Sequence, residues 1–145
     1  MKKMFQVFAL AGLVLMGVAA SASAQTASSS MKVRVGFDFN VGNQQLPAGE
    51  YRIKTLNNSP SQQLIQVESV DGRVQAIVGS IPNPGSGRLA VGEVQFNRYG
   101  DKYFLSSVRV GDDFIHEVLK SRAERQVTGN VSLQQKHVTL PATIQ

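Results

Sequence analysis

The sequence has no cysteine and no tryptophan, and it has only two histidines. Without cysteine the chain can form no disulfide, no thiol nucleophile and no Cys-based zinc or iron–sulfur site. A folded domain with this composition must rely on its hydrophobic core for stability, without disulfides. Beyond the N-terminal region no apolar run reaches the roughly 20 residues that a membrane-spanning helix needs. We therefore expect no stable membrane span in the mature chain.

The N-terminal residues have the three parts of an export signal. Residues 1–4 are positively charged, residues 5–20 are mostly apolar, and residues 21–24 read Ser-Ala-Ser-Ala. This order predicts a signal peptide over residues 1–24 that is removed before Gln25. The alternative is an uncleaved N-terminal anchor, which the short apolar run disfavours. We expect a bacterial protein that is secreted or periplasmic.

The charge pattern does not favour nucleic acid as a partner. The whole chain has a formal net charge of +5, and removal of Lys2 and Lys3 with the signal lowers it to +3. The remaining basic residues are scattered along alternating segments, which is typical of solvated strand faces. We expect no nucleic-acid binding.

Period-two alternation of apolar and polar residues predicts β-strands. Residues 32–39 alternate strictly, from Lys32 and Val33 onward. Asp71-Gly72 lies between two β-branched runs, a pattern that indicates a hairpin because glycine accepts a positive φ. A second hairpin is expected around residues 99–101. The expected strands cover 32–39, 50–54, 64–70, 73–79, 91–98 and 102–110.

Three further segments leave some alternatives open. Residues 81–88 contain two prolines and two glycines and are expected to form the longest loop. Residues 114–119 fit either a last strand or the start of a helix. Ser121 and Glu124 have the S-x-x-E spacing of a capping box, which predicts a short helix over residues 122–127. The alternation of residues 130–145 is weak.

Together these features predict an all-β fold, an antiparallel β-sandwich or barrel of six to seven strands with one short C-terminal helix. The expected domain spans residues 32–129. It follows a disordered leader over residues 25–31 and precedes residues 130–145, which form either a C-terminal tail or an extra strand. A parallel α/β fold is disfavoured because no long amphipathic helices separate the strands.

One short segment resembles a known module. Residues 46–53 read Leu-Pro-Ala-Gly-Glu-Tyr-Arg-Ile, which is similar to the L-P-x-G-x-Y-x-[VI] segment of transthyretin-like sandwich modules, including collagen-adhesin B-type repeats. The proline and glycine shape a turn into a strand, and the tyrosine and isoleucine are expected to pack inward. The resemblance implies a fold class and no particular function.

A second resemblance covers most of the chain after the signal. Residues 37–42 and 46–51, residues 96–105 and residues 120–125 occur in the order seen in a family of small exported proteins of acidobacterial type. Members of that family have no assigned function. The resemblance therefore implies export and brings no activity with it.

Candidate catalytic chemistry is sparse. His116 lies near Asp112, Asp113 and Glu117, so a metal or acid–base site is conceivable there. Metal sites usually need three or more convergent ligands at defined spacing, and the spacing here favours a lone surface histidine beside a turn. No serine lies in G-x-S-x-G, and no phosphate-binding or dinucleotide motif occurs. We predict a non-enzyme without metal or cofactor; a hydrolase with a site near His116 is the less favoured alternative.

The second expected hairpin carries a candidate recognition patch. Arg98, Tyr99, Asp101 and Tyr103 bring aromatic and charged side chains to one hairpin tip, and such residues are favoured at recognition surfaces. The alternative is structural, with Tyr99 packed inward and Asp101 closing the turn. The expected function is a non-catalytic exported domain that binds a protein or polysaccharide of the cell envelope or has a structural role there. The alternative is a self-assembling or adhesive module in which residues 130–145 add a strand to a neighbour, so an oligomer is possible.

Overall fold

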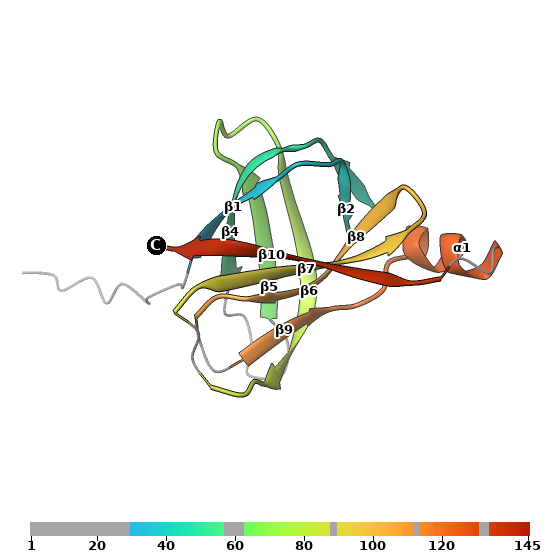
Figure 1. Ribbon diagram of the computed structural model, residues 1–145. Helices are drawn as coiled ribbons and strands as arrows, with labels where there is room; N and C mark the ends of the chain where they lie inside the picture. Colours follow the sequence, from blue (N-terminus) through green and yellow to red (C-terminus); the bar gives the residue numbers. More distant parts are fainter. Residues whose placement is uncertain (1–29, 57–62, 88–89, 112–113, 131–133) are drawn as a thin grey trace, which may run out of the picture.

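The computed structural model describes residues 30–56, 63–87, 90–111, 114–130 and 134–145 (Figure 1). These residues form ten strands and one helix. They are β1 (Ser30–Val35), β2 (Phe39–Val41), β3 (Gln44–Leu46), β4 (Gly49–Leu56), β5 (Gln63–Ser69), β6 (Gln75–Pro84), β7 (Gly92–Tyr99), β8 (Lys102–Arg109), β9 (Phe114–Val118), α1 (Arg122–Asn130) and β10 (Lys136–Ile144).

Eight of the strands close into an antiparallel barrel. Their order around the barrel is β1, β4, β5, β6, β9, β8, β7 and β10, and β10 pairs again with β1. The predicted all-β architecture with a short helix is confirmed, and the barrel alternative is the correct one. The remaining strands, β2 and β3, are added to the sheet at β8, and β2 runs parallel to β8.

Alternating side chains from every wall fill the barrel. Phe39 lies edge-on to Tyr51 and to Phe96, with ring centroids 5.1 and 5.3 Å apart. Such edge-to-face pairs add to the stabilisation that burial of apolar surface supplies. The fully or nearly fully buried apolar residues are Met31, Val33, Val35, Phe39, Val41, Leu46, Tyr51, Ile53, Ile65, Val67, Ala76, Val94, Phe96, Tyr99, Phe104, Leu105, Val108, Val110 and Ala142.

The first strand begins earlier and ends earlier than its alternation predicts. β1 starts at Ser30, and Met31 is fully buried, so the expected disordered leader over 25–31 is wrong at its last two residues. Residues 25–29 lie outside the described residues. The chain then leaves the ladder before β2, because the Asp38 carboxylate accepts a hydrogen bond of 2.9 Å from the backbone N–H of Ala48. Alternation continues across this break, which is why the sequence predicted one strand.

A hairpin of two short strands was not predicted. Gly42-Asn43 is a turn signal in the sequence that predicted a turn over residues 40–45, and the observed turn is only these two residues, between the paired residues Val41 and Gln44. Gly42 has a φ of +62°, whereas the φ of Asn43 is not positive. A type II′ turn requires this combination. This hairpin, β2–β3, is one reason why the strand number exceeds the expected six to seven.

The segment expected to be the longest loop is partly strand. β6 continues through Pro82 to Pro84 and pairs with β9. The Ser69 N–H donates a hydrogen bond to the Val74 carbonyl. Because backbone groups point alternately to the two sides of a strand, the even-numbered residues of β6 direct their N–H and C=O groups toward β5. Among the described residues, the last register pair with β5 is at Ser80, and both prolines lie beyond it. The described part of the β5–β6 ladder therefore needs no N–H donor from either proline.

The C-terminal elements decide the remaining alternatives. Residues 114–118 are a strand, the helix is longer than the expected 122–127, and β10 is an integral strand between β7 and β1. Of the two alternatives for residues 130–145, the structure therefore shows the extra strand, over residues 136–144. None of the described helical residues form a segment long and apolar enough to cross a membrane.

Candidate functional site

One face of the sheet beyond the barrel carries a row of side chains in register. Gln45 of β3 pairs with Asn40 of β2, Asn40 pairs with Phe104 of β8, and Phe104 pairs with Asn97 of β7. Directly opposed residues of neighbouring strands point to the same face. α1 lies beside the tip of the β7–β8 hairpin (Figure 1).

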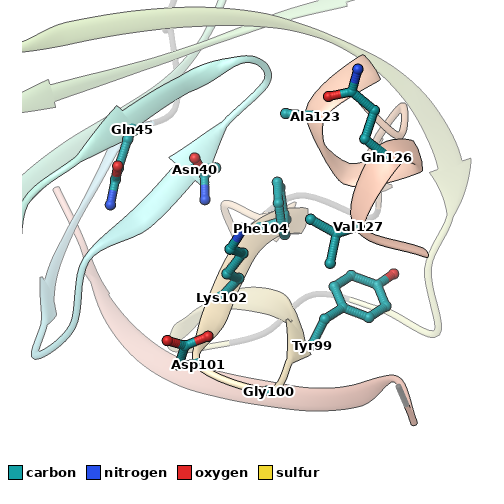
Figure 2. A pocket seen from close by; sticks show the side chains of 10 residues that line it. All are labelled: Asn40, Gln45, Tyr99, Gly100, Asp101, Lys102, Phe104, Ala123, Gln126 and Val127. Atoms are coloured by element: carbon teal, nitrogen blue, oxygen red, sulfur yellow. The ribbon is translucent and has the colours of Figure 1, made fainter. Parts of the chain in front are cut away.

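The space between α1 and the two hairpins is a cleft of about 570 Å³. Figure 2 shows Asn40 and Gln45 on one side, Phe104 in the centre, and Ala123 and Val127 of α1 on the other side. We call this space the α1 cleft. Its lining residues are Asn40, Gln45, Tyr99, Gly100, Asp101, Lys102, Phe104, Ala123, Gln126 and Val127.

A buried carboxylate attaches α1 to the sheet. Glu124 is only 3% exposed, and its Oε1 accepts hydrogen bonds from Asn97 Nδ2 at 2.8 Å and from the Tyr99 hydroxyl at 2.9 Å. Glu124 also lies in the first turn of α1, where the helix dipole favours negative charge. Two donors and the dipole together offset the cost of burying the carboxylate.

The predicted capping box is half formed. Ser121 Oγ accepts a hydrogen bond of 3.1 Å from the Glu124 N–H, as the S-x-x-E spacing predicts. The Glu124 side chain points instead to Asn97 and Tyr99. The difference arises because the sheet presents two polar donors to the same side of the helix, which the local sequence cannot indicate.

Two contacts from distant segments complete the attachment. Asn43 Oδ1, in the β2–β3 turn, accepts a hydrogen bond of 3.1 Å from the backbone N–H of Ala123. Gln135, just before β10, donates through Nε2 to Asn97 Oδ1 at 3.0 Å. The helix is therefore fixed to β2–β3 at its N-terminus and to β7 through its first turn, so the width of the α1 cleft is set by both hairpins.

The buried phenol of Tyr99 is perturbed by this arrangement. Burial and the hydrogen bond to Glu124 raise the pKa of Tyr99 to about 12. Tyr99 therefore keeps its proton, and its role as donor to Glu124, well above physiological pH.

The four residues of the expected recognition patch lie on two different faces. Tyr99 and Asp101 line the α1 cleft. Arg98 and Tyr103 are paired on the opposite face of the hairpin, where the Arg98 guanidinium carbon lies 5.4 Å from the Tyr103 ring centroid. Tyr103 in turn stacks on Phe37 at 3.9 Å. The structure therefore brings together only half of the patch.

Arg98 closes the turn at the tip of the β7–β8 hairpin, whereas the structural alternative expected Asp101 to close it. Tyr99 is buried, as that alternative expected. Gly100 has a φ of +64°, and its carbonyl accepts a hydrogen bond of 2.7 Å from Arg98 Nε. Asp101 is exposed at the rim of the α1 cleft.

His116 is not the surface residue that its neighbours suggested. Its side chain is fully buried, and it lies opposite Val108 of β8 and Pro82 of β6, inside the barrel. The prediction rested on the missing spacing of a metal site, which does not indicate burial, whereas β9 alternates and turns His116 inward. Asp112 and Asp113 lie outside the described residues. Within the described residues no group of three or more His, Asp or Glu side chains could hold a metal ion.

Several cleft residues could not be recognised from the sequence. Asn40 and Gln45 belong to the unpredicted β2–β3 hairpin, as does Asn43, which bonds the start of α1. Phe104 and Gln126 carry no signal as single residues. The Gly42-Asn43 pair was the available signal for the hairpin. No local signal indicates that β2 pairs with β8, which is the contact that forms the floor of the cleft.

No family model matches the chain, and neither a curated protein nor a solved structure matches it. The two resemblances noted in the sequence, to transthyretin-like modules and to small exported proteins of acidobacterial type, therefore stay predictions. The geometry of the α1 cleft is the basis on which a function can be proposed.

Proposed function

We propose that the chain is exported and acts outside the cytoplasm as a non-catalytic binding domain, with the α1 cleft as its ligand site. The observation that supports this is the way the cleft is built. Three segments far apart in the sequence, at Asn40–Gln45, Tyr99–Phe104 and Ala123–Val127, meet around it. Buried Glu124 joins α1 to the Tyr99–Phe104 hairpin, and Asn43 joins α1 to the Asn40–Gln45 hairpin. A simple surface helix would need no such buried charge.

The lining of the cleft fits a neutral, hydroxyl-rich polymer, such as a polysaccharide of the cell envelope. Gln45 and Gln126 each offer both a donor and an acceptor, as sugar hydroxyls require. Asp101 and Lys102 add one charge of each sign, so the rim has no net charge. Phe104 and Val127 give the cleft an apolar floor against which a sugar ring can pack.

Binding of soluble envelope polysaccharide fragments can be measured by NMR chemical-shift perturbation and by calorimetry. We expect shifts confined to the backbone amides of the cleft, and we expect the double variant Gln45→Ala, Gln126→Ala to lose roughly 10-fold or more in affinity. Gln66→Ala on β5 is the matched control, because Gln66 does not line the cleft. Shifts located elsewhere, or equal affinity in the double variant and the control, would contradict the assignment of this cleft.

A further inference from the structure

β10 is paired very unequally on its two sides. On the β7 side the register runs over seven residues, from Lys136 opposite Arg98 to Ala142 opposite Gly92. On the β1 side it covers only Ile144 and Thr143. Among the described residues, the segment 136–142 therefore has a paired edge and an unpaired edge.

The hydrogen-bond alternation tells which backbone groups face the unpaired edge. The Gln145 N–H bonds the Ser30 carbonyl at 2.9 Å, so odd-numbered residues of this segment direct their backbone groups toward β1. The next odd residue before Thr143 is Pro141, which has no N–H to donate. The ladder with β1 ends at this point for that reason.

His137 and Thr139 are the odd residues beyond the proline. Their backbone N–H and C=O groups face away from β7, and both residues are exposed. Gly36, which follows β1, is also exposed, and a side chain there would meet nothing within 4 Å. The edge is therefore open to solvent, and an exposed row of unpaired backbone groups is a template for another strand.

We infer that this edge pairs with the same edge of a second copy, so that two barrels join antiparallel through β10. A twofold axis perpendicular to a strand sets that strand antiparallel to its copy, and a twofold interface uses the same patch on both subunits, so a second copy carries the matching edge without further adaptation. With the axis at Val138, His137 lies opposite Thr139 of the second copy, and each such pair exchanges both N–H···O bonds. This interface lies on a different surface from the α1 cleft, and the inference does not depend on the proposed ligand.

The side chains agree with this register. Lys136 falls opposite Leu140 of the second copy, so no like charges meet directly. Val138 and Leu140 are only half-buried within one chain, and the second strand covers them further. Among the described strands, β3 also has an unpaired edge, but it is only three residues long and is followed by Pro47, which makes it a poorer template.

Amide hydrogen exchange on the purified protein tests the inference without any mutation. When the protein concentration rises from micromolar to millimolar, we expect exchange at His137 and Thr139 to slow at least 10-fold. Exchange at Val138 and Leu140, whose N–H groups already bond β7, is expected to stay the same. Unchanged exchange at His137 and Thr139, or equal slowing at odd and even positions, would overturn the proposal.

Sedimentation velocity measures whether two chains associate in solution. The wild-type protein should reach twice the mass of one chain at high concentration. Thr139→Pro should stay at the mass of one chain, because the proline removes an N–H that faces the open edge. Thr139→Val keeps that N–H and should dimerise like the wild type. Thermal unfolding shows whether each variant is folded. A wild type that stays a single chain at every concentration, or a folded Thr139→Pro that still doubles in mass, contradicts pairing through this edge.

Discussion

At the scale of single residues, Glu124 is the group on which the position of α1 depends. It is a buried carboxylate whose side-chain donors, Asn97 and Tyr99, are neutral, so hydrogen bonds rather than an ion pair hold it. Hydrogen bonds to a charged group are stronger than neutral ones, and leaving such a group with one donor fewer costs about 1–3 kcal/mol. The network is therefore sensitive to small changes in either donor.

The phenol of Tyr99 predicts a stability change at high pH. Its pKa in the folded protein, about 12, lies above the ordinary value of 10.0. A raised pKa means that the stabilisation is complete below pH 10 and is lost as the pH rises toward about 12, by roughly 2–3 kcal/mol from the two-unit shift. Urea unfolding at a series of pH values measures this loss.

Tyr99→Phe is the control for that experiment, because it removes the ionisable hydroxyl and keeps the ring. The variant should be about 1–3 kcal/mol less stable at neutral pH, since Glu124 loses a donor. It should also show a smaller decrease in stability between pH 10 and 12 than the wild type. An equal decrease in both proteins would show that Tyr99 is not the group that titrates.

Gly92 predicts a second effect at the scale of one residue. A Cβ at this position would lie 2.6 Å from Met31 Sδ and 3.2 Å from the Arg109 carbonyl, inside the core. We expect Gly92→Ala to lower the free energy of unfolding by about 1–3 kcal/mol, as overpacking does. Gly36→Ala is the matched control, because nothing lies within 4 Å of its Cβ position, and it should change stability by less than about 0.5 kcal/mol. Denaturant unfolding of both variants checks the difference.

At the scale of elements, the β7–β8 hairpin extends beyond the barrel and is covered on both faces. Tyr99 and Phe104 face α1, and Tyr103 faces Phe37 on the other side. These contacts explain why β8 has apolar side chains on both of its faces. They also explain why the expected recognition patch divides: neighbouring residues of a strand point to opposite faces, so a cluster in sequence is not a cluster in space.

Asn43 predicts that the two hairpins are coupled through the helix. Its side chain accepts the Ala123 N–H, one of the N–H groups that a helix leaves unpaired at its start. Asn43→Ala should destabilise the start of α1 by about 1 kcal/mol, as the loss of a helix cap does. Amide exchange at Ala123 should accelerate accordingly, roughly 5-fold, in hydrogen-exchange NMR.

Gln44→Ala is a suitable comparison, because Gln44 lies in the same hairpin but bonds the Gln75 carbonyl instead of the helix. It should leave exchange at Ala123 unchanged. If both variants accelerate that amide equally, the hairpin rather than the cap controls the helix.

At the scale of the whole molecule, the barrel is closed by its last strand. β10 pairs with both β7 and β1, so the final residues of the sequence complete a ring that β1 began. Long-range pairing of this kind costs loop-closure entropy before it contributes stability. In the absence of disulfides the closed ring and its apolar core hold the fold.

Export predicts a defined mature chain. Expression of the full sequence in a bacterial host should give an extracytoplasmic form that begins at Gln25 and carries a net charge of +3. Intact-mass spectrometry of the periplasmic fraction identifies the N-terminus. Substitution of Ala22 and Ala24 by bulky residues should block the processing, and a full-length chain in the periplasmic fraction of the wild type would contradict cleavage.

Local patterns in the sequence were enough for the all-β class, the hairpin at Asp71-Gly72, the strand segments of β4, β5, β7 and β8, the first half of β6 and the helix that starts after Ser121. These features depend on alternation, on turn residues that accept a positive φ, and on capping spacing, all of which act within a few residues. The absence of cysteine likewise excludes thiol and disulfide chemistry whatever the fold.

Only the tertiary structure decided the rest. Whether the sheet closes, where Glu124 finds its donors, and which side His116 faces all depend on pairings between segments far apart in the sequence. The α1 cleft exists because β2 pairs with β8 at a single position, Asn40 opposite Phe104. The sequence does not indicate which backbone groups pair with one another, since every residue except proline offers the same donor and acceptor.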